Sequence, residues 1–159
     1  IVKGGGHAMA AGITVERERL GELRAFFESR AASAVTQLRH SESLRVDAAL
    51  SADGATLELF DTLEHAGPYG AGHGAPVLVL PRHRIADARV VGNGHVKVEL
   101  RSEMGGRLAG IAFRAAESAL GRFLFDKRGQ AVHVAGSLAG NFWNGTRSVQ
   151  FRVTDAAEA

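Results

Sequence analysis

The first half of the chain shows a helical spacing of apolar residues. Between residues 16 and 39, apolar side chains recur at steps of three and four, which places them on one face of a helix. The members of this stripe are Leu20, Leu23, Phe27, Ala31, Ala34 and Leu38. We expect the stripe to be buried in a core. A short strand is expected before it at residues 13–15, and a second helix after it at residues 54–64.

The second half changes to the alternation that is typical of strands. Residues 95–101 alternate strictly, so that Val96, Val98 and Leu100 point to one face of a strand and the charged residues to the other. The dipeptide Asn144-Gly145 predicts a tight hairpin turn. Further strands are predicted at residues 77–80, 107–113, 131–138 and 147–153, with a short helix near 115–120.

Five short strands with one helix between the third and the fourth give the outline of a Greek-key β-barrel of the OB type. The predicted fold class is therefore α+β: a small α/β fragment of strand and helix, followed by a five-stranded barrel. The pattern alone also permits a β-sandwich or another small barrel. The Gly/Pro-rich stretch 67–76 marks the break. We divide the chain into residues 1–43, a connecting strand, helix and linker over 44–75, and the barrel over 76–155.

Charge separates the two halves as well. Residues 1–75 hold seven Lys/Arg and ten Asp/Glu, whereas residues 76–155 hold twelve and six. The basic half suits a polyanion such as nucleic acid, although a solvated surface in an arginine-rich protein would show the same excess. The lack of cysteine excludes disulfides and fits a reducing cytoplasm. No apolar run is long enough for a membrane span, and Ile1 indicates a piece of a longer protein.

Gly4, Gly5, Gly6 and His7 form the most unusual stretch of the sequence. It is not a dinucleotide fingerprint, because Met9 stands where the third glycine would be, and no Gly-Lys-Ser/Thr follows as in a P-loop. Glycines that take positive φ could form a backbone nest for an anion, with a helix starting near His7. A plain strand-to-helix turn capped by His7 is the alternative.

The other histidines and the carboxylates show no catalytic pattern. The seven histidines contain no pair at ligand spacing, and the carboxylates are scattered along the chain. We therefore expect no metal centre and no catalytic triad, which counts against a self-contained hydrolase. The stretch 67–76 is given no chemical role, and Tyr69 is expected to hold that loop in place.

The barrel half carries the candidates for nucleic-acid binding. Phe142 and Trp143 precede the Asn-Gly turn, and neighbours on a strand point to opposite faces, so one ring should be exposed. An exposed ring could stack on a base; alternatively, Phe142 or Trp143 simply plugs the barrel end. The other candidates occupy outward positions of the predicted strands. They are Lys97, Arg101, Arg107, His133, Arg147, Gln150 and Arg152.

Three motifs, in this order, resemble the bacterial RecJ family of single-stranded-DNA-specific exonucleases, which belongs to the DHH phosphoesterase superfamily. The stretch GGGHAMAAG at 4–12 is similar to the glycine-histidine motif of that family's DHH-associated domain. The stretch LEHAGPYGAG at 63–72 resembles the segment leading into its OB domain, and FWNGTRSVQ at 142–150 resembles its late hairpin. Two departures stand out: His73-Gly74 replaces the usual Asn-Pro, and Trp143 is inserted into the hairpin pattern.

The resemblance implies that residues 1–43 end a DHH-associated domain and that the barrel binds single-stranded DNA. Gly4, Gly5, Gly6 and His7 would hold a substrate phosphate beside a metal centre, with Mn²⁺ or Mg²⁺ bound in a catalytic domain outside this chain. The parent would be a monomeric, cytoplasmic 5′-to-3′ exonuclease of DNA repair and recombination, with a single-strand-binding protein or a helicase as partner. This chain alone would be inactive. A non-catalytic single-strand-binding adaptor and another DHH-family phosphodiesterase are the alternatives.

Overall fold

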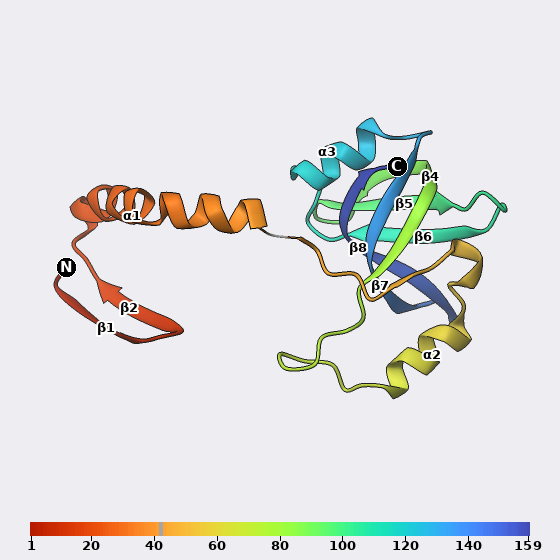
Figure 1. Cartoon of the computed structure of the whole chain (residues 1–159), viewed down its shortest axis with the longest axis horizontal. Coiled ribbons are helices and arrows are strands. Elements are labelled where there is room, and N and C mark those ends of the chain that lie inside the picture. Colours follow the sequence, from red (N-terminus) through yellow and green to blue (C-terminus); the bar gives the residue numbers. More distant parts are fainter. Residues whose placement is uncertain (42) are drawn as a thin grey trace. The chain divides into compact units, whose positions relative to one another are not determined.

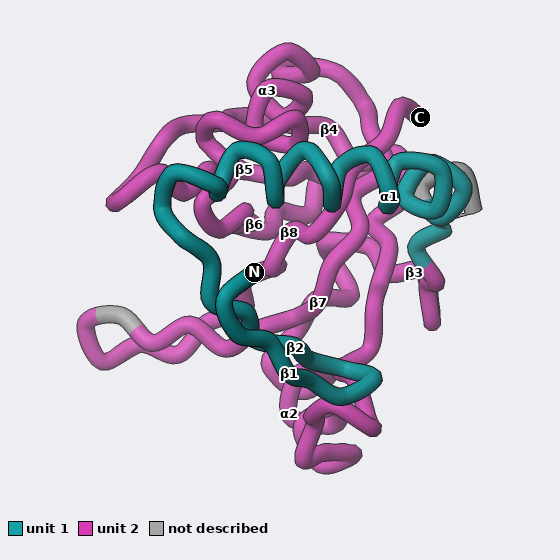
Figure 2. Tube along the Cα trace, turned by 90° about the vertical axis from the view of Figure 1, so that its left-hand side faces the viewer, with its two compact units in different colours: residues 1–44 teal, residues 45–159 magenta. Residues whose placement is uncertain are grey.

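The chain folds into two compact units, residues 1–44 and residues 45–159 (Figure 2). The structure, a computed structural model, describes the backbone of residues 1–41 and 43–159 and the side chains of residues 1–38, 43–142 and 144–159. The two units differ in what covers their apolar side chains.

The first unit is a β-hairpin followed by a long helix (Figure 1). Strands β1 (Lys3–His7) and β2 (Ala10–Thr14) pair antiparallel, a short 3₁₀ turn η1 (Arg17–Arg19) follows, and helix α1 spans Leu20–Ser41. The long helix was predicted. The strand expected at 13–15 begins earlier, and its partner β1 was not predicted, because three consecutive glycines show no alternation of apolar and polar side chains.

The predicted burial of the α1 stripe is wrong. None of the described side chains of residues 1–38 is buried, and Phe27, in the middle of the stripe, is 52% exposed. A two-stranded hairpin rich in glycine offers no apolar face broad enough to cover a helix of 22 residues. Exposed ion pairs about one turn apart, Arg19–Glu22 and Arg24–Glu28, support the helix locally instead.

The second unit contains a closed five-stranded barrel, which confirms the predicted fold class (Figure 1). Strand β4 pairs with β5, β5 with β6, β6 with β8 and β8 with β7, and β7 closes the barrel onto β4. The β6–β8 pairing is parallel, and the long connection from β6 through α3 and β7 permits it. The strands are β4 (Leu78–Val91), β5 (His95–Arg101), β6 (Arg107–Ala112), β7 (Ala131–Trp143) and β8 (Thr146–Glu158).

Alternating apolar residues fill the barrel interior, as their spacing predicted. Val96, Val98 and Leu100 of β5 are at most 2% exposed, and Phe151 of β8 is fully buried. Because one face of each strand is committed to this interior, every second residue is left to face outward. The other fully buried side chains are Leu80, Ile85, Leu124, Val132 and Val134.

Helix α3 (Ala119–Asp126) lies between β6 and β7 in the chain, as predicted, but it starts later than residue 115. The Ser118 hydroxyl accepts a hydrogen bond from the backbone N–H of Gly121 at 3.1 Å, which caps the first turn. Leu124 then enters the core as the helix crosses the barrel end.

Strand β4 runs well beyond the apolar segment 77–80 that predicted it. It continues because residues 84–91 pair with β5, and the apolar pattern did not show this because a polar side chain, His83, is buried at only 3% exposure. Its Nε2 accepts the backbone N–H of Ala52 at 2.9 Å, and its Nδ1–H donates to the Pro81 carbonyl at 2.8 Å. The imidazole thereby fastens the turn η2 (Ala52–Gly54) to the barrel, while β3 (Ala48–Ala49) pairs parallel with β4.

Helix α2 (Leu57–His65) packs on the barrel beside strands β7 and β8. Thr56 caps it, because its hydroxyl accepts the backbone N–H of Leu59 at 3.1 Å. The loop that follows is held as expected, since the Tyr69 hydroxyl donates a hydrogen bond to the carbonyl of Leu63.

Candidate nucleic-acid interface

The outward residues of β5, β6 and β8 form a continuous surface, called the outer face below. Lys97 of β5 stands opposite Ile111 of β6, and Ile111 stands beside Arg152 of β8. The β4–β5 turn and the β7–β8 hairpin connect the strands at its borders. In OB folds, the corresponding face and loops bind oligonucleotides.

A groove of about 510 Å³ lies on the outer face beside the β7–β8 hairpin. Its lining is entirely polar: Lys97, Asn141, Asn144, Thr146, Ser148 and Gln150. None of these described residues is acidic, and Lys97 forms no ion pair with another described side chain. Amides and hydroxyls can both donate and accept hydrogen bonds, so the lining suits phosphate oxygens and base edges alike.

A second basic band crosses the opposite end of the outer face. Arg84, Arg101 and Arg107 stand in register on β4, β5 and β6. Arg101 is held by Glu99 at 2.8 Å. Arg107 has no carboxylate within ion-pair distance among the described side chains, so its charge is available to an external anion.

The β7–β8 hairpin turns at Asn144-Gly145, as predicted. The φ angles of 47° and 77° put both residues in the left-handed region, as a type I′ turn requires. Phe142 is 73% exposed just before the turn. The side chain of Trp143 lies outside the described residues, so its predicted role remains a prediction.

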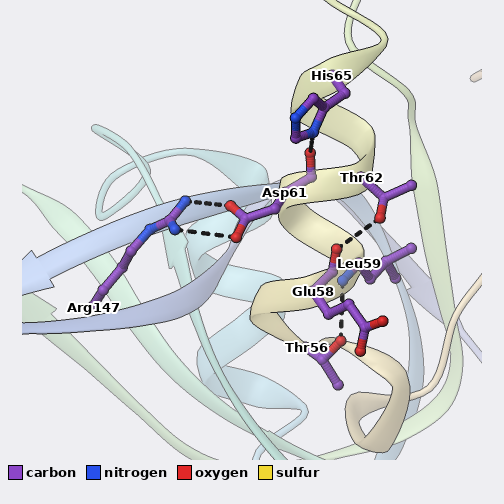
Figure 3. A network of polar contacts seen from close by, with 7 residues as sticks. All are labelled: Thr56, Glu58, Leu59, Asp61, Thr62, His65 and Arg147. Atoms are coloured by element: carbon purple, nitrogen blue, oxygen red, sulfur yellow. Dashed lines mark hydrogen bonds and ion pairs between the residues drawn. The ribbon is translucent and has the colours of Figure 1, made fainter.

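Arg147 does not face outward as predicted. It shares the face of β8 that carries Phe151 inward, and beyond the barrel end it reaches helix α2 (Figure 3). Both Asp61 oxygens bind its guanidinium, with 3.2 Å between Nη1 and Oδ2, and its Cζ lies 5.6 Å from the Phe60 ring centroid. Because this ion pair occupies the charge, we remove Arg147 from the candidate interface.

His133 lies on the barrel wall away from the groove. It belongs to β7, where it pairs with Ala157, and its Nδ1 accepts the backbone N–H of Arg82 at 3.4 Å. The structure therefore brings Lys97 and Gln150 together in the groove, with Arg152 next to them and Arg107 in the second basic band. It does not bring His133 to them.

The sequence reasoning missed the neutral lining of the groove: Asn141, Asn144, Thr146 and Ser148. A signal existed on β8, since Thr146, Ser148 and Gln150 alternate with inward residues. These neutral residues were not predicted, because the candidates were chosen mainly for a charge or an aromatic ring. Phe113, an exposed ring directly after β6, was not predicted either.

The glycine stretch forms strand β1, and its predicted nest is wrong. None of the glycines at 4–6 has a φ in the left-handed region, and no helix starts at His7. Gly6 permits a close approach, because a Cβ there would lie 2.6 Å from the Cβ of Ala11. Gly5 has open space where its side chain would be, on the side that also carries Lys3 and His7.

The comparison with protein families identifies the barrel. The family described as RecJ OB domain matches residues 46–155, more than half of the chain. The chain belongs to the RecJ OB domain family. This confirms the predicted resemblance, and the outer face is therefore the outer face of a RecJ OB domain.

Full-length relatives match both units. The single-stranded-DNA-specific exonuclease RecJ of Escherichia coli (strain K12) is 34% identical over 155 residues, covering 94% of this chain and 25% of the relative. RecJ of Salmonella typhimurium is 32% identical over 160 residues, covering 98% and 26%. The chain thus spans about a quarter of the length of these curated relatives.

A solved structure agrees with the sequence matches. The crystal structure of RecJ in complex with Mn²⁺ from Thermus thermophilus aligns with a TM-score of 0.61 at 25% identity, covering 99% of this chain and 22% of that chain. A second structure of the same protein is in complex with Mg²⁺. Among the residues described for the present chain, no group of three or more His, Asp or Glu side chains could hold a metal ion. No helix in that described part is long and apolar enough to cross a bilayer.

Proposed function

We propose that the outer face binds single-stranded DNA. The observation that carries the proposal is the groove lined by Lys97, Gln150 and neutral hydrogen-bonding side chains, with no acidic residue in its lining. Arg107 of β6 and Arg152 of β8 add positive charge to the outer face, which also carries the outward carboxylate of Glu99, paired with Arg101. Phosphates would contact the cations of this face. Phe142, although exposed, pairs with Arg147 in the β7–β8 register, so its ring lies on the other side of the hairpin from the groove.

The relatives support a larger role for the parent protein. We infer that it is a single-stranded-DNA-specific exonuclease that digests from the 5′ end, in DNA repair and recombination. Mn²⁺ or Mg²⁺ would be held outside this chain, and the barrel would retain the substrate strand. A cytoplasmic location, and a single-strand-binding protein or a helicase as partner, belong to the same proposal. This chain alone should digest no single strand in either metal.

We also propose that the β1–β2 hairpin holds a substrate phosphate. Gly5 and its register partner Gly12 both leave open space, and Lys3 and His7 flank Gly5 on the same side. A phosphate could therefore approach the bare strand between two potential cations. In the full-length parent, Gly5→Val and His7→Ala should lower turnover, whereas Thr14→Val on the same face should not.

The experiment for the outer face is a titration of a labelled oligothymidine, followed by fluorescence anisotropy at several salt concentrations. Lys97→Gln and Arg107→Gln should each weaken binding and lower the log–log salt slope by about 0.7, the value for one phosphate contact on a single strand. Arg24→Gln is the matched control, because Arg24 is an exposed arginine of α1. Equal slopes in all variants would overturn the proposal.

A further inference from the structure

Phe113, at the end of β6, is an exposed aromatic ring on a barrel that buries its apolar residues well. It is 51% exposed, whereas Phe151 of the neighbouring strand is fully buried. The Cζ atom of Arg152 lies over the ring, 5.3 Å from its centroid. The His95 ring meets it edge to face, with 5.1 Å between the centroids and 72° between the planes.

The backbone holds this ring in a fixed place. Arg114, the next residue, has a φ of 52°, in the left-handed region, which is unfavourable for an arginine. The His95 side chain stabilises this corner, because its Nδ1 accepts the Arg114 backbone N–H at 2.9 Å. The chain returns to the barrel at once, since Ala115 is buried. The exposure of Phe113 therefore follows from the left-handed backbone at Arg114 and from the hydrogen bond that His95 accepts there.

The ring also continues the proposed binding surface. Arg152 stands beside Ile111, and Ile111 stands opposite Lys97, which lines the groove. His95 is the next outward position of β5, and Phe113 directly follows the last residue of β6, so both extend the same outer face toward the β4–β5 turn. A strand that fills the groove and follows this face would reach the ring.

We propose that Phe113 is a stacking platform for an unpaired nucleobase, with Arg152 and Arg114 beside it to contact the flanking phosphates. The inference rests on the proposed function of the outer face and assigns a residue that reads bases there. An aromatic ring offers its face to any base, and a nearby guanidinium adds a cation–π contribution. Neither arginine has an ion-pair partner among the described side chains, so both charges remain available.

The test compares Phe113→Ala with the parent chain on two probes: oligothymidine and an abasic sugar-phosphate strand of the same length. Phe113→Ala should weaken binding to oligothymidine roughly 5- to 150-fold, the range for loss of one stacked base. On the abasic strand the loss should vanish, and the salt slope should stay unchanged, because no phosphate contact is removed. Phe113→Trp should retain binding to oligothymidine.

The matched control is Met104→Ala, an apolar residue that is 91% exposed at the β5–β6 turn, where no loss is expected. Unchanged binding of Phe113→Ala to oligothymidine would overturn the stacking role of Phe113, but it would not contradict the proposal that the outer face binds single-stranded DNA. An equal loss on both probes would also overturn it, since the ring would then act through structure and not through stacking. If the unmodified chain binds neither probe, the proposal that the outer face binds single-stranded DNA is wrong, and the stacking role of Phe113 is overturned as well.

Discussion

The two units contain similar apolar residues but differ in how far each unit's own elements cover them. Phe151 is fully buried inside the closed barrel of residues 45–159, whereas Phe27 on α1 of residues 1–44 is 52% exposed. Burial stabilises the barrel, while α1 depends on its own hydrogen bonds and on exposed ion pairs, which contribute little. An apolar stripe therefore indicates a face that can be buried, and only the fold shows whether a partner is present.

The largest expected effect is a loss of stability in the barrel unit. Phe151→Ala should lower the free energy of unfolding by about 3–5 kcal/mol, because it removes a large buried ring and leaves a cavity. Urea unfolding followed by circular dichroism measures the loss. Phe27→Ala, the same substitution on α1, should change it by less than about 0.5 kcal/mol. Comparable losses in both variants would contradict the division between a buried and an uncovered unit.

A second prediction concerns two histidines, one in each unit. His83→Ala should cost about 1–3 kcal/mol, because the Ala52 N–H would lose its acceptor in a buried place. His7→Ala is the control, since His7 is exposed on the β1–β2 hairpin and should leave stability unchanged. Urea unfolding distinguishes them. A negligible effect of His83→Ala would mean that the hydrogen bond does not fasten η2 to the barrel.

Strict alternation predicted the barrel strands well, and interruptions of it caused the errors. Strand β5 was predicted with its ends, because each inward residue is apolar and each outward residue is polar. Strand β4 was predicted only in part, since a buried histidine reads as an outward residue until its two hydrogen bonds are known. The hairpin β1–β2 was missed because glycine has no side chain to show a pattern.

The candidate site was predictable as a region and less so as a set of residues. Lys97 and Gln150 were assigned outward and do line the groove. Arg147 was misassigned because its partner, Asp61, lies 86 residues away in the sequence and no local pattern connects them. Phe113 was overlooked because its exposure follows from the left-handed backbone at Arg114, a tertiary feature.

The ion pair between Arg147 of β8 and Asp61 of α2 tests whether α2 is stabilised by the barrel unit. In a double-mutant cycle with Arg147→Ala and Asp61→Ala, the coupling energy should be about 0.5–1 kcal/mol, since both side chains are about half exposed, at 50% and 42%. The matched cycle on Arg24 and Glu28 of α1 should give about 0.3–0.5 kcal/mol, because those side chains are more exposed. A coupling energy of zero for Arg147 and Asp61 would mean that their ion pair does not stabilise the packing of α2 against β8.

The smallest expected effect is a pH dependence at the end of β8. The Nζ atom of Lys127 lies 2.6 Å from Oε1 of Glu158. The hydrogen bond between them is the main cause, and the lysine charge the second, that lowers the pKa of the Glu158 carboxyl below its ordinary value of 4.5. The folded state therefore favours the carboxylate, so the pair stabilises the barrel above pH 4.5 and the contribution is lost as pH falls through the lowered pKa. In Lys127→Gln, the NMR titration midpoint of Glu158 should move up toward the ordinary value. Because this carboxylate is exposed, the free energy of unfolding should change least among the four tests. A midpoint that does not move would show that Lys127 is not the cause of the shift.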